Sequence, residues 1–271
     1  MKGKVIIITG ASSGIGLACA REFARRGAVL SLAARNIEAL ETVRDELMHQ
    51  GCRVIATQTD VSVANDCLHL IRTTVKTFGK IDILVNNAGL SMRALFKDVE
   101  LEVLKKLMDV NFWGTVYCTK FALPYLLVSK GSVVGISSIA GFVGLPARTG
   151  YSASKFAMNG FLETLRTENR NTGLHVLIAA PGFTATNVRK SALTANGTPQ
   201  GETPREEEKM MSAEKVAVYL AKAIEKRKRS LILTFWEGKF TVFCNKWFSS
   251  FVSKSAFKKM AKEPKSPLKL F

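Results

Sequence analysis

Continuous apolar runs and longer amphipathic segments alternate along the chain. The runs are short and rich in β-branched residues, as in Val5–Thr9, which is typical of strands buried on both faces of a parallel sheet. Glycine, asparagine or aspartate often follows a run directly, where a strand would end. The predicted strands are 5–9, 29–34, 53–59, 81–85, 131–137, 174–180 and 230–233.

The segments between these runs have the length and pattern of helices. Strand and helix alternate with short connections, which predicts an α/β fold: a single Rossmann-type, doubly wound parallel sheet flanked by helices. We expect this domain over residues 1–235 and a basic amphipathic extension over 236–271. The first predicted helix starts in the glycine-rich segment 10–16 and ends near residue 26. The other predicted helices are 37–50, 62–78, 101–128, 151–172, 212–227 and, in the extension, 236–262.

A glycine-rich turn joins the first strand to the first helix. Glycines let a backbone approach a pyrophosphate, and the N–H groups of a helix's first turn face an anion with the positive end of the dipole. The Gly-x-x-x-Gly-x-Gly spacing differs from the usual dinucleotide fingerprint, but the strand before it and the helix after it favour a cofactor site. The expected cofactor-binding residues here are Gly10, Ser12, Ser13, Gly14, Ile15 and Gly16.

The second strand ends in Arg35-Asn36 without a carboxylate. An acidic residue at this position would bind the adenosine ribose, whereas an arginine suits a 2′-phosphate. The alternative is a surface arginine at the start of a helix. We therefore expect Arg35 and Asn36 to bind NADP(H) rather than NAD.

Polar residues also follow the third, fourth and fifth strands, on the side where doubly wound sheets bind ligands. Asp60 could equally cap the next helix, and Asn86-Asn87 could form a turn; neither role excludes a cofactor contact. Asn111 lies in an apolar helical stretch, where it is either a satisfied structural amide or a holder of ordered water. The residues at the three strand ends are Asp60, Val61, Asn87, Ala88, Gly89 and Ser138.

Tyr151 and Lys155 are the candidate acid/base pair. On a helix, positions i and i+4 share a face, so the ammonium of Lys155 can bias the phenol of Tyr151 toward its anion. Isolated Tyr-x-x-x-Lys spacing is more often a solvated helix face, so the assignment depends on the motifs upstream.

These motifs together resemble the short-chain dehydrogenase/reductase family over residues 4–233. Six motifs in the right order and structural context are far more specific than any one of them. They are Thr9-Gly10-x-x-x-Gly14-x-Gly16, Asn86-Asn87-Ala88-Gly89, Asn111, Ser138, Tyr151-x-x-x-Lys155 and Pro181-Gly182.

The resemblance implies a role for each catalytic residue. Tyr151 would exchange a proton with the substrate oxygen and Ser138 would hydrogen-bond that oxygen. Lys155 would hold the nicotinamide ribose and lower the pKa of Tyr151, and Asn111 would anchor a water that relays protons to Lys155. The expected cofactor contacts are Asn87, with Ala88 and Gly89, at the adenosine ribose, Asp60 and Val61 at the adenine, and Pro181, Gly182, Thr184 and Thr186 at the carboxamide and diphosphate.

One position departs from the family pattern. Relatives that prefer NADP often carry a basic residue just before the second glycine, where this chain has Ser13. Arg35 would therefore determine most of the cofactor preference.

Composition restricts the class of protein. With 271 residues and 47% apolar content the chain is not a disordered protein. Its net charge of +17 indicates affinity for nucleic acid, affinity for an anionic membrane surface, or a role in solubility. The excess is concentrated at the C-terminus, because residues 236–271 alone hold eight lysines and two glutamates, a charge of +6. We expect no nucleic-acid partner.

Cysteine and histidine spacing predicts neither a disulfide framework nor a metal site. The N-terminus enters a strand almost at once, and no run reaches the roughly 18 apolar residues of a spanning helix, so we expect no signal peptide and a cytoplasmic, reducing location. The cysteines of the chain are Cys19, Cys52, Cys67, Cys118 and Cys244, and the histidines are His49, His69 and His175.

The tail has aromatic residues at three- and four-residue spacing, with lysines on other faces. A membrane surface and packing on the domain or a second subunit remain equal alternatives, since both bury the same apolar stripe. Substrate contacts should come from three segments, 90–96, 139–147 and 183–211. The last segment contains Gly197, Pro204 and Glu206-Glu207-Glu208, a composition that predicts a mobile lid.

The predicted function is an NADP(H)-dependent oxidoreductase that interconverts a carbonyl and a secondary alcohol on a small hydrophobic substrate, without a metal. The direction is open because the chemistry is reversible. We expect a homo-oligomer, dimer or tetramer, located in the cytoplasm and associated with a membrane surface if the tail binds lipid. The alternative is a catalytically idle NADP-binding partner or a membrane-surface protein.

Overall fold

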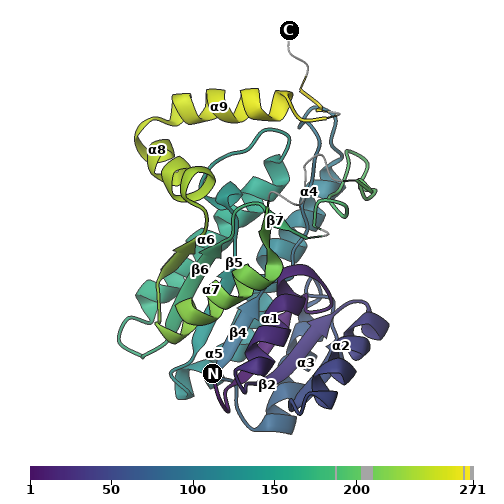
Figure 1. The fold of residues 1–271 in the computed structure, drawn as a ribbon, viewed down its shortest axis with the longest axis vertical. Helices are drawn as coiled ribbons and strands as arrows, with labels where there is room; N and C mark the ends of the chain where they lie inside the picture. Colours follow the sequence, from purple (N-terminus) through teal and green to yellow (C-terminus); the bar gives the residue numbers. More distant parts are fainter. Residues whose placement is uncertain (187, 203–209, 265, 269–271) are drawn as a thin grey trace.

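The computed structural model describes residues 1–186, 188–202, 210–264 and 266–268. Seven parallel strands form one sheet in the order β3-β2-β1-β4-β5-β6-β9 (Figure 1). The predicted doubly wound sheet is confirmed, and the strand ends differ from the predicted ones by no more than two residues. The strands are β1 Val5–Thr9, β2 Val29–Ala34, β3 Val54–Gln58, β4 Ile83–Asn86, β5 Ser132–Ile136, β6 His175–Ala180 and β9 Ser230–Ile232.

β1 and β4 lie side by side inside the sheet, where the winding direction changes. β1 pairs with β2 in the register Val5↔Val29 and with β4 in the register Ile6↔Ile83. The chain runs from β1 outward to β3, returns to β4 and then runs outward to β9 on the other side. The loops after β1 and β4 therefore diverge, and a crevice forms at the carboxyl ends of these strands.

Two helical layers cover the sheet because successive strand residues point to opposite faces. Ile6 and Ile8 pack with α1 Gly14–Arg25, α2 Ile37–His49 and α7 Ala213–Glu225. Ile7 points the other way, into the core formed with the second layer, which consists of α3 Ala64–Phe78, α5 Gly114–Val128 and α6 Thr149–Glu168.

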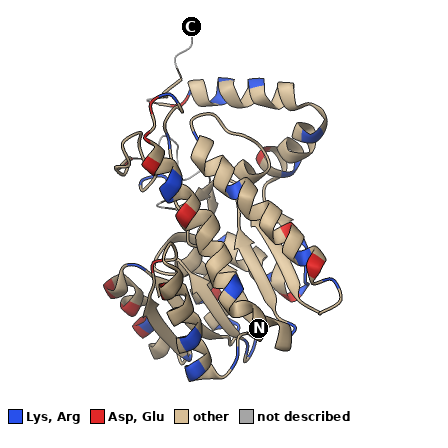
Figure 2. Ribbon diagram, turned by 180° about the vertical axis from the view of Figure 1, so that it is seen from behind, with Lys and Arg blue, Asp and Glu red and all other residues tan. Residues whose placement is uncertain are grey.

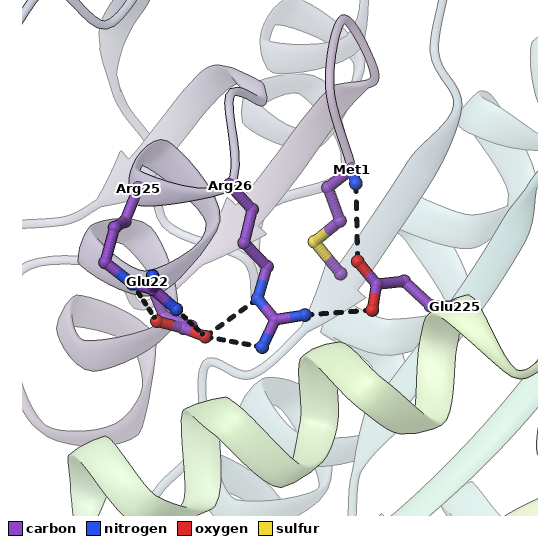
Figure 3. Close-up of polar contacts among 5 residues, drawn as sticks. All are labelled: Met1, Glu22, Arg25, Arg26 and Glu225. Atoms are coloured by element: carbon purple, nitrogen blue, oxygen red, sulfur yellow. Dashed lines mark hydrogen bonds and ion pairs between the residues drawn. The ribbon is translucent and has the colours of Figure 1, made fainter.

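An ion-pair cluster joins α1, α7 and the N-terminus (Figure 3). Glu22, only 9% exposed, accepts hydrogen bonds from Arg25 at 2.9 Å and Arg26 at 2.7 Å. Arg26 also contacts Glu225 at 2.9 Å, and the amino group of Met1 lies 3.3 Å from the same carboxylate. The hydrogen bond from Arg25, together with Arg26, lowers the pKa of Glu22 against the effect of burial.

The single α-helix predicted over 101–128 is wrong in its middle. α4 Leu101–Met108 and α5 are joined by a π-helical segment, Asp109–Trp113. A π-helical turn inserts an extra residue between two helical faces, often at a functional site, and leaves no clear signal in the apolar spacing. Asn111 lies in this segment.

The single helix predicted over 236–262 is also wrong. The structure has a π-helical segment Phe235–Phe240, then α8 Thr241–Trp247 and α9 Ser249–Ala261. The chain leaves helical geometry at Phe248 (φ −133°, ψ 50°), and the bend lets both helices lie across one end of the molecule (Figure 1). The division into 1–235 and 236–271 stays a prediction.

The described part of 183–211 pairs with its neighbours. β7 Thr184–Ala185 and β8 Met211–Ser212 form a short parallel pair, and Leu193 bridges to both Met92 and Pro199. Pro204 and Glu206-Glu207-Glu208 of the predicted lid lie outside the described residues, as do Lys265 and Lys269 of the tail. In the described ranges no helix is both long and apolar enough to cross a bilayer.

Candidate functional site

A cavity of about 500 Å³ opens in the crevice beyond the carboxyl ends of β1 and β4. It brings together residues predicted from separate parts of the sequence. Gly16 and Asn111 are the predicted residues that do not line it. Those that do are Gly10, Ser12, Ser13, Gly14, Ile15, Arg35, Asn36, Asp60, Val61, Asn87, Ala88, Gly89, Ser138, Tyr151, Lys155, Pro181, Gly182, Thr184 and Thr186.

The glycine turn needs its glycines for geometry. Gly10 and Gly14 have φ values of 66° and 55°, in the left-handed region that favours glycine. A Cβ on Gly16 would lie 2.2 Å from the carbonyl oxygen of Gly10, so Gly16 lets α1 start directly against the turn. The side-chain amide of Asn87 donates to the carbonyls of Thr9 (2.9 Å) and Gly10 (3.1 Å), which fixes the turn to the end of β4.

The N-terminus of α1 faces this cavity without a capping side chain. Ser13 is the N-cap residue, with extended backbone and no side-chain hydrogen bond to the helix, and the first turn contains no acidic residue. The first N–H groups of α1 therefore present the positive end of the helix dipole to the cavity. This turn fits the pyrophosphate of a dinucleotide.

Arg35 lies at the rim of the same cavity, directly after β2. Its guanidinium is exposed and forms no hydrogen bond or ion pair with the residues that the structure describes. Asn36 caps α2 through a 2.8 Å hydrogen bond from the amide of Ala39. A cation at this strand end fits a 2′-phosphate, and that contact stays a prediction.

Asp60 does order the start of the next helix. One of its carboxylate oxygens accepts hydrogen bonds from the amide (2.9 Å) and the hydroxyl (2.6 Å) of Ser62, just before α3. It lines the cavity as well, so the structural role does not exclude the adenine contact, which stays a prediction.

α6 presents Tyr151 and Lys155 on one face, as their spacing predicts. The helix begins at Thr149, two residues before the predicted start. The Lys155 ammonium lies 6.0 Å from the centroid of the Tyr151 ring and donates a 2.9 Å hydrogen bond to the carbonyl of Ile136, at the end of β5. A Cβ on Gly89 would lie 3.5 Å from this ammonium, so Gly89 brings the loop after β4 close to Lys155.

Burial shifts the pKa of both groups. Desolvation lowers the pKa of Lys155 to about 8, from an ordinary value of 10.5. Desolvation also raises the pKa of Tyr151, and neither the hydrogen bond with Ser138 nor the charge of Arg148 overcomes that effect. The prediction that Lys155 brings the pKa of Tyr151 below its ordinary value is therefore wrong for this arrangement, because burial of the phenolate outweighs the nearby donors.

Asn111 is fully buried behind the cavity and held on both sides of its amide. Its oxygen accepts from the backbone N–H of Leu90 (2.8 Å), and its nitrogen donates to the carbonyl of Leu90 and the hydroxyl of Ser154 (both 2.9 Å). These bonds favour the structural interpretation of the side chain. The water-holding role stays a prediction.

Sequence reasoning missed Arg148. Its guanidinium donates to the hydroxyl of Ser91 (2.8 Å) and the carbonyl of Met92 (3.1 Å), which ties the loop after β4 to the start of α6. The charge of Arg148 also opposes the rise in the pKa of Tyr151. The available signal was a cation three residues before Tyr151.

A second cavity of about 370 Å³ adjoins the first. Phe183 and Leu145 line both cavities, together with Ser138 and Arg148. The tail therefore packs on the domain at an edge of the candidate active site, and packing on the domain is one of its predicted roles. The residues of the tail that line this second cavity are Trp236, Glu237, Phe240, Thr241, Cys244, Phe251, Val252, Ser255, Ala256, Lys259, Met260 and Glu263.

Metal-ligating side chains do not gather in the part of the chain that the structure describes: no group of three His, Cys, Asp or Glu could hold an ion. All five cysteines are free thiols.

Fold and site together define a nucleotide-binding α/β protein of the doubly wound type. The family described as short chain dehydrogenase matches residues 4–197. Dehydrogenase/reductase SDR family member 7B of Rattus norvegicus is 36% identical over 244 residues, which cover 86% of this chain and 74% of the relative. The chain therefore belongs to the short-chain dehydrogenase/reductase family.

Other relatives are longer than this chain. The 11-beta-hydroxysteroid dehydrogenase A of Arachis hypogaea is 44% identical over 198 residues, 72% of this chain and 56% of the relative. The 11-beta-hydroxysteroid dehydrogenase-like 2 of Arabidopsis thaliana is 45% identical over 188 residues, 69% of this chain and 61% of the relative. The chain thus spans less than two thirds of either relative.

Solved structures share the fold. An alcohol dehydrogenase from Thermococcus sibiricus, complexed with 5-hydroxy-NADP, has a TM-score of 0.75 at 27% identity and covers 86% of this chain and 96% of its own. A short-chain dehydrogenase/reductase from Burkholderia phymatum, in complex with NAD, has a TM-score of 0.79 at 24% identity and covers 99% of both chains. The second comparison concerns the fold alone.

Proposed function

We propose that the protein is an NADP(H)-dependent oxidoreductase that interconverts a carbonyl and a secondary alcohol on a hydrophobic substrate. The observation that carries this proposal is one continuous cavity. It joins the glycine turn and the N-terminus of α1 to Ser138, Tyr151 and Lys155.

The cofactor supplies or accepts the hydride when it is bound. In the reducing direction, the hydroxyl of Ser138 donates a hydrogen bond to the substrate carbonyl oxygen, and Tyr151 gives that oxygen its proton. A C–H and an O–H bond form as the C=O double bond becomes single, and Tyr151 recovers a proton from solvent. The oxidising direction reverses each step.

The electrostatics of the two residues suit this role. The raised pKa of Tyr151 keeps the phenol protonated at neutral pH, as a proton donor must be. Lys155, with a pKa of about 8, is still mostly an ammonium at neutral pH, so a positively charged hydrogen-bond donor lies beside the Tyr151 ring. Because the chemistry is reversible, the proposal does not choose the physiological direction.

Arg35 supports NADP(H) as the cofactor. It is the basic residue at the rim where an adenosine ribose would lie, and Ser12 and Ser13 add hydroxyl donors in the glycine turn. Structural neighbours carry either an NADP derivative or NAD, so the preference rests on this chain's own residues.

The second cavity supports a hydrophobic substrate. Its walls include Phe183, Trp236, Phe240 and Phe251, and it meets the first cavity at Ser138. Two of the relatives are named as hydroxysteroid dehydrogenases or similar to them, which agrees with a bulky apolar substrate.

A cofactor oxidation screen tests the proposal. Purified full chain is mixed with NADPH or NADH and a panel of steroid ketones, aromatic ketones, aliphatic aldehydes and small polar ketones. We expect turnover with bulky apolar ketones and a preference for NADPH. Tight NADPH binding without turnover of any carbonyl, or of the matching alcohols with NADP, would support the idle nucleotide-binding alternative instead.

A further inference from the structure

The tail carries an unusual concentration of exposed aromatic side chains. Among the described residues eighteen large hydrophobic side chains are exposed, and eight of them are Phe or Trp within residues 235–257. Isolated exposed hydrophobics are normal on a protein surface, but a contiguous group indicates an interaction site. We call this group the aromatic face; it consists of Phe235, Trp236, Phe240, Phe243, Trp247, Phe248, Phe251 and Phe257, with exposures from 41% to 70%.

The helices of the tail have an inner and an outer side. In α9, Val252 and Met260 are 5% and 6% exposed and point toward the domain, whereas Phe251 is 67% exposed. In α8, Phe243 and Trp247 lie one turn apart and are 61% and 67% exposed. α8 and α9 lie at one end of the molecule, in the upper part of Figure 1, and the exposed rings that they carry therefore lie at that end.

Positive charge surrounds the aromatic face. Both acidic residues of the described tail form ion pairs: Glu237 pairs with Lys259 at the surface of the tail, and Glu263 pairs with the buried side chain of Arg93 at 3.5 Å. α9 itself has basic positions and no acidic one, as Figure 2 shows. In the described tail, the exposed lysines that form no ion pair with the described residues are Lys239, Lys246, Lys254, Lys258 and Lys262.

We propose that the aromatic face docks on an anionic lipid membrane. Trp and Phe side chains partition to the headgroup boundary of a bilayer, and nearby lysines are attracted to anionic headgroups. A second copy of this chain fits less well, because a symmetric contact would place the lysines of one copy against the same lysines of the other, and like charges repel. A lipid surface buries the aromatic rings and neutralises the lysines together.

The aromatic face is continuous with the second cavity. Trp236, Phe240 and Phe251 line that cavity and are also 70%, 43% and 67% exposed, so they form its rim on the outer side of the tail. If the proposed function holds, an apolar substrate dissolved in the membrane could reach Ser138 without crossing bulk water. The docking itself does not depend on that function.

Vesicle co-sedimentation of the full chain tests the proposal, with phosphatidylcholine vesicles and with vesicles that also contain phosphatidylglycerol. We expect binding to the anionic vesicles only, weakening as salt is raised. Each lysine near an anionic surface contributes roughly a fivefold increase in partitioning, so Lys246→Gln, Lys254→Gln and Lys258→Gln together should lower it roughly 100-fold. The matched control replaces three exposed lysines elsewhere: Lys76, Lys120 and Lys222.

A second pair of variants tests the aromatic contribution. Phe243→Ser with Trp247→Ser should release the protein from anionic vesicles, whereas Phe96→Ser, at a side chain 63% exposed outside the tail, should not. Unchanged thermal unfolding of each variant shows that the fold survives.

Two results would overturn the proposal. One is a parent chain that stays in the supernatant with anionic vesicles. The other is a dimer, seen by light scattering, that the Phe243 and Trp247 changes convert to monomer while vesicle binding is unaffected. Because the assay measures partitioning, failure of the docking and failure of the proposed enzyme activity are separate outcomes.

Discussion

Replacing Lys155 by Met separates the stability of the fold from the chemistry of the site. Lys155 is 3% exposed, and the only hydrogen bonds described for its ammonium go to the carbonyl of Ile136 and, at 3.9 Å, to the sulfur of Met158. No carboxylate among the described residues pairs with it. The protein therefore holds an unpaired positive charge in its interior.

The magnitude follows from the pKa of Lys155. A drop from 10.5 to about 8 corresponds to about 3 kcal/mol of unfavourable free energy for the charged form in the folded state. Loss of the hydrogen bond to Ile136 costs about 1 kcal/mol. We therefore expect Lys155→Met to raise the free energy of unfolding by about 2 kcal/mol at neutral pH, while turnover is lost.

The effect has a definite pH dependence. The folded-state pKa of this lysine lies below its unfolded-state value, so the folded protein pays the full penalty below about pH 8. Between about pH 8 and pH 10.5 the folded ammonium loses its proton before the unfolded one, and the penalty shrinks. The stability of the parent should therefore approach that of the variant as the pH rises through this window.

Urea unfolding of the nucleotide-free parent and variant at neutral pH and at about pH 10 measures both quantities. Lys120→Met, at an exposed position of α5, is the matched control and should change stability little at either pH. A Lys155→Met variant that is less stable than the parent at neutral pH, or a difference that does not change with pH, would refute the reasoning.

Three further predictions address the cofactor site and the fold. Arg35→Ala should weaken NADPH binding by about 1.5 to 3 kcal/mol in fluorescence titrations and leave NADH binding unchanged; equal losses for both cofactors would contradict the assignment. Gly16→Ala, which places a Cβ 2.2 Å from the carbonyl of Gly10, should abolish binding of either nucleotide, whereas Gly160→Ala, with open space around it, should not. Glu22→Gln should lower the free energy of unfolding by about 1 to 2 kcal/mol at neutral pH. This loss should vanish as the pH falls below the lowered pKa of the Glu22 carboxyl, which urea unfolding at a series of acidic pH values measures.

The sheet could be predicted because its signals are local. Runs such as Val5–Thr9 are continuous and apolar because both faces of the strand are buried, and Gly10 marks the end of the first run. Parallel winding then places every strand end on one edge, so residues far apart in the sequence could be assigned to one cavity.

Other features depend on geometry that the sequence does not reveal. The π-helical segment around Asn111 and the break at Phe248 interrupt two predicted helices, and no proline lies at either point to mark the interruption. The direction of the pKa shift of Tyr151 depends on how deeply the ring is buried, which spacing cannot give. The part of the tail in the second cavity depends on packing between segments about a hundred residues apart, such as the 3.1 Å hydrogen bond from Asn245 to Phe142.

The most direct test of the proposed function is the Tyr151→Phe variant, assayed for NADPH oxidation with whichever apolar ketone the parent turns over. Removal of the phenolic proton should lower turnover by about 100-fold or more. The dissociation constant for NADPH should stay unchanged, and Tyr219→Phe, at an exposed position of α7, should behave as the parent. A Tyr151→Phe variant that keeps the parental rate would contradict the account.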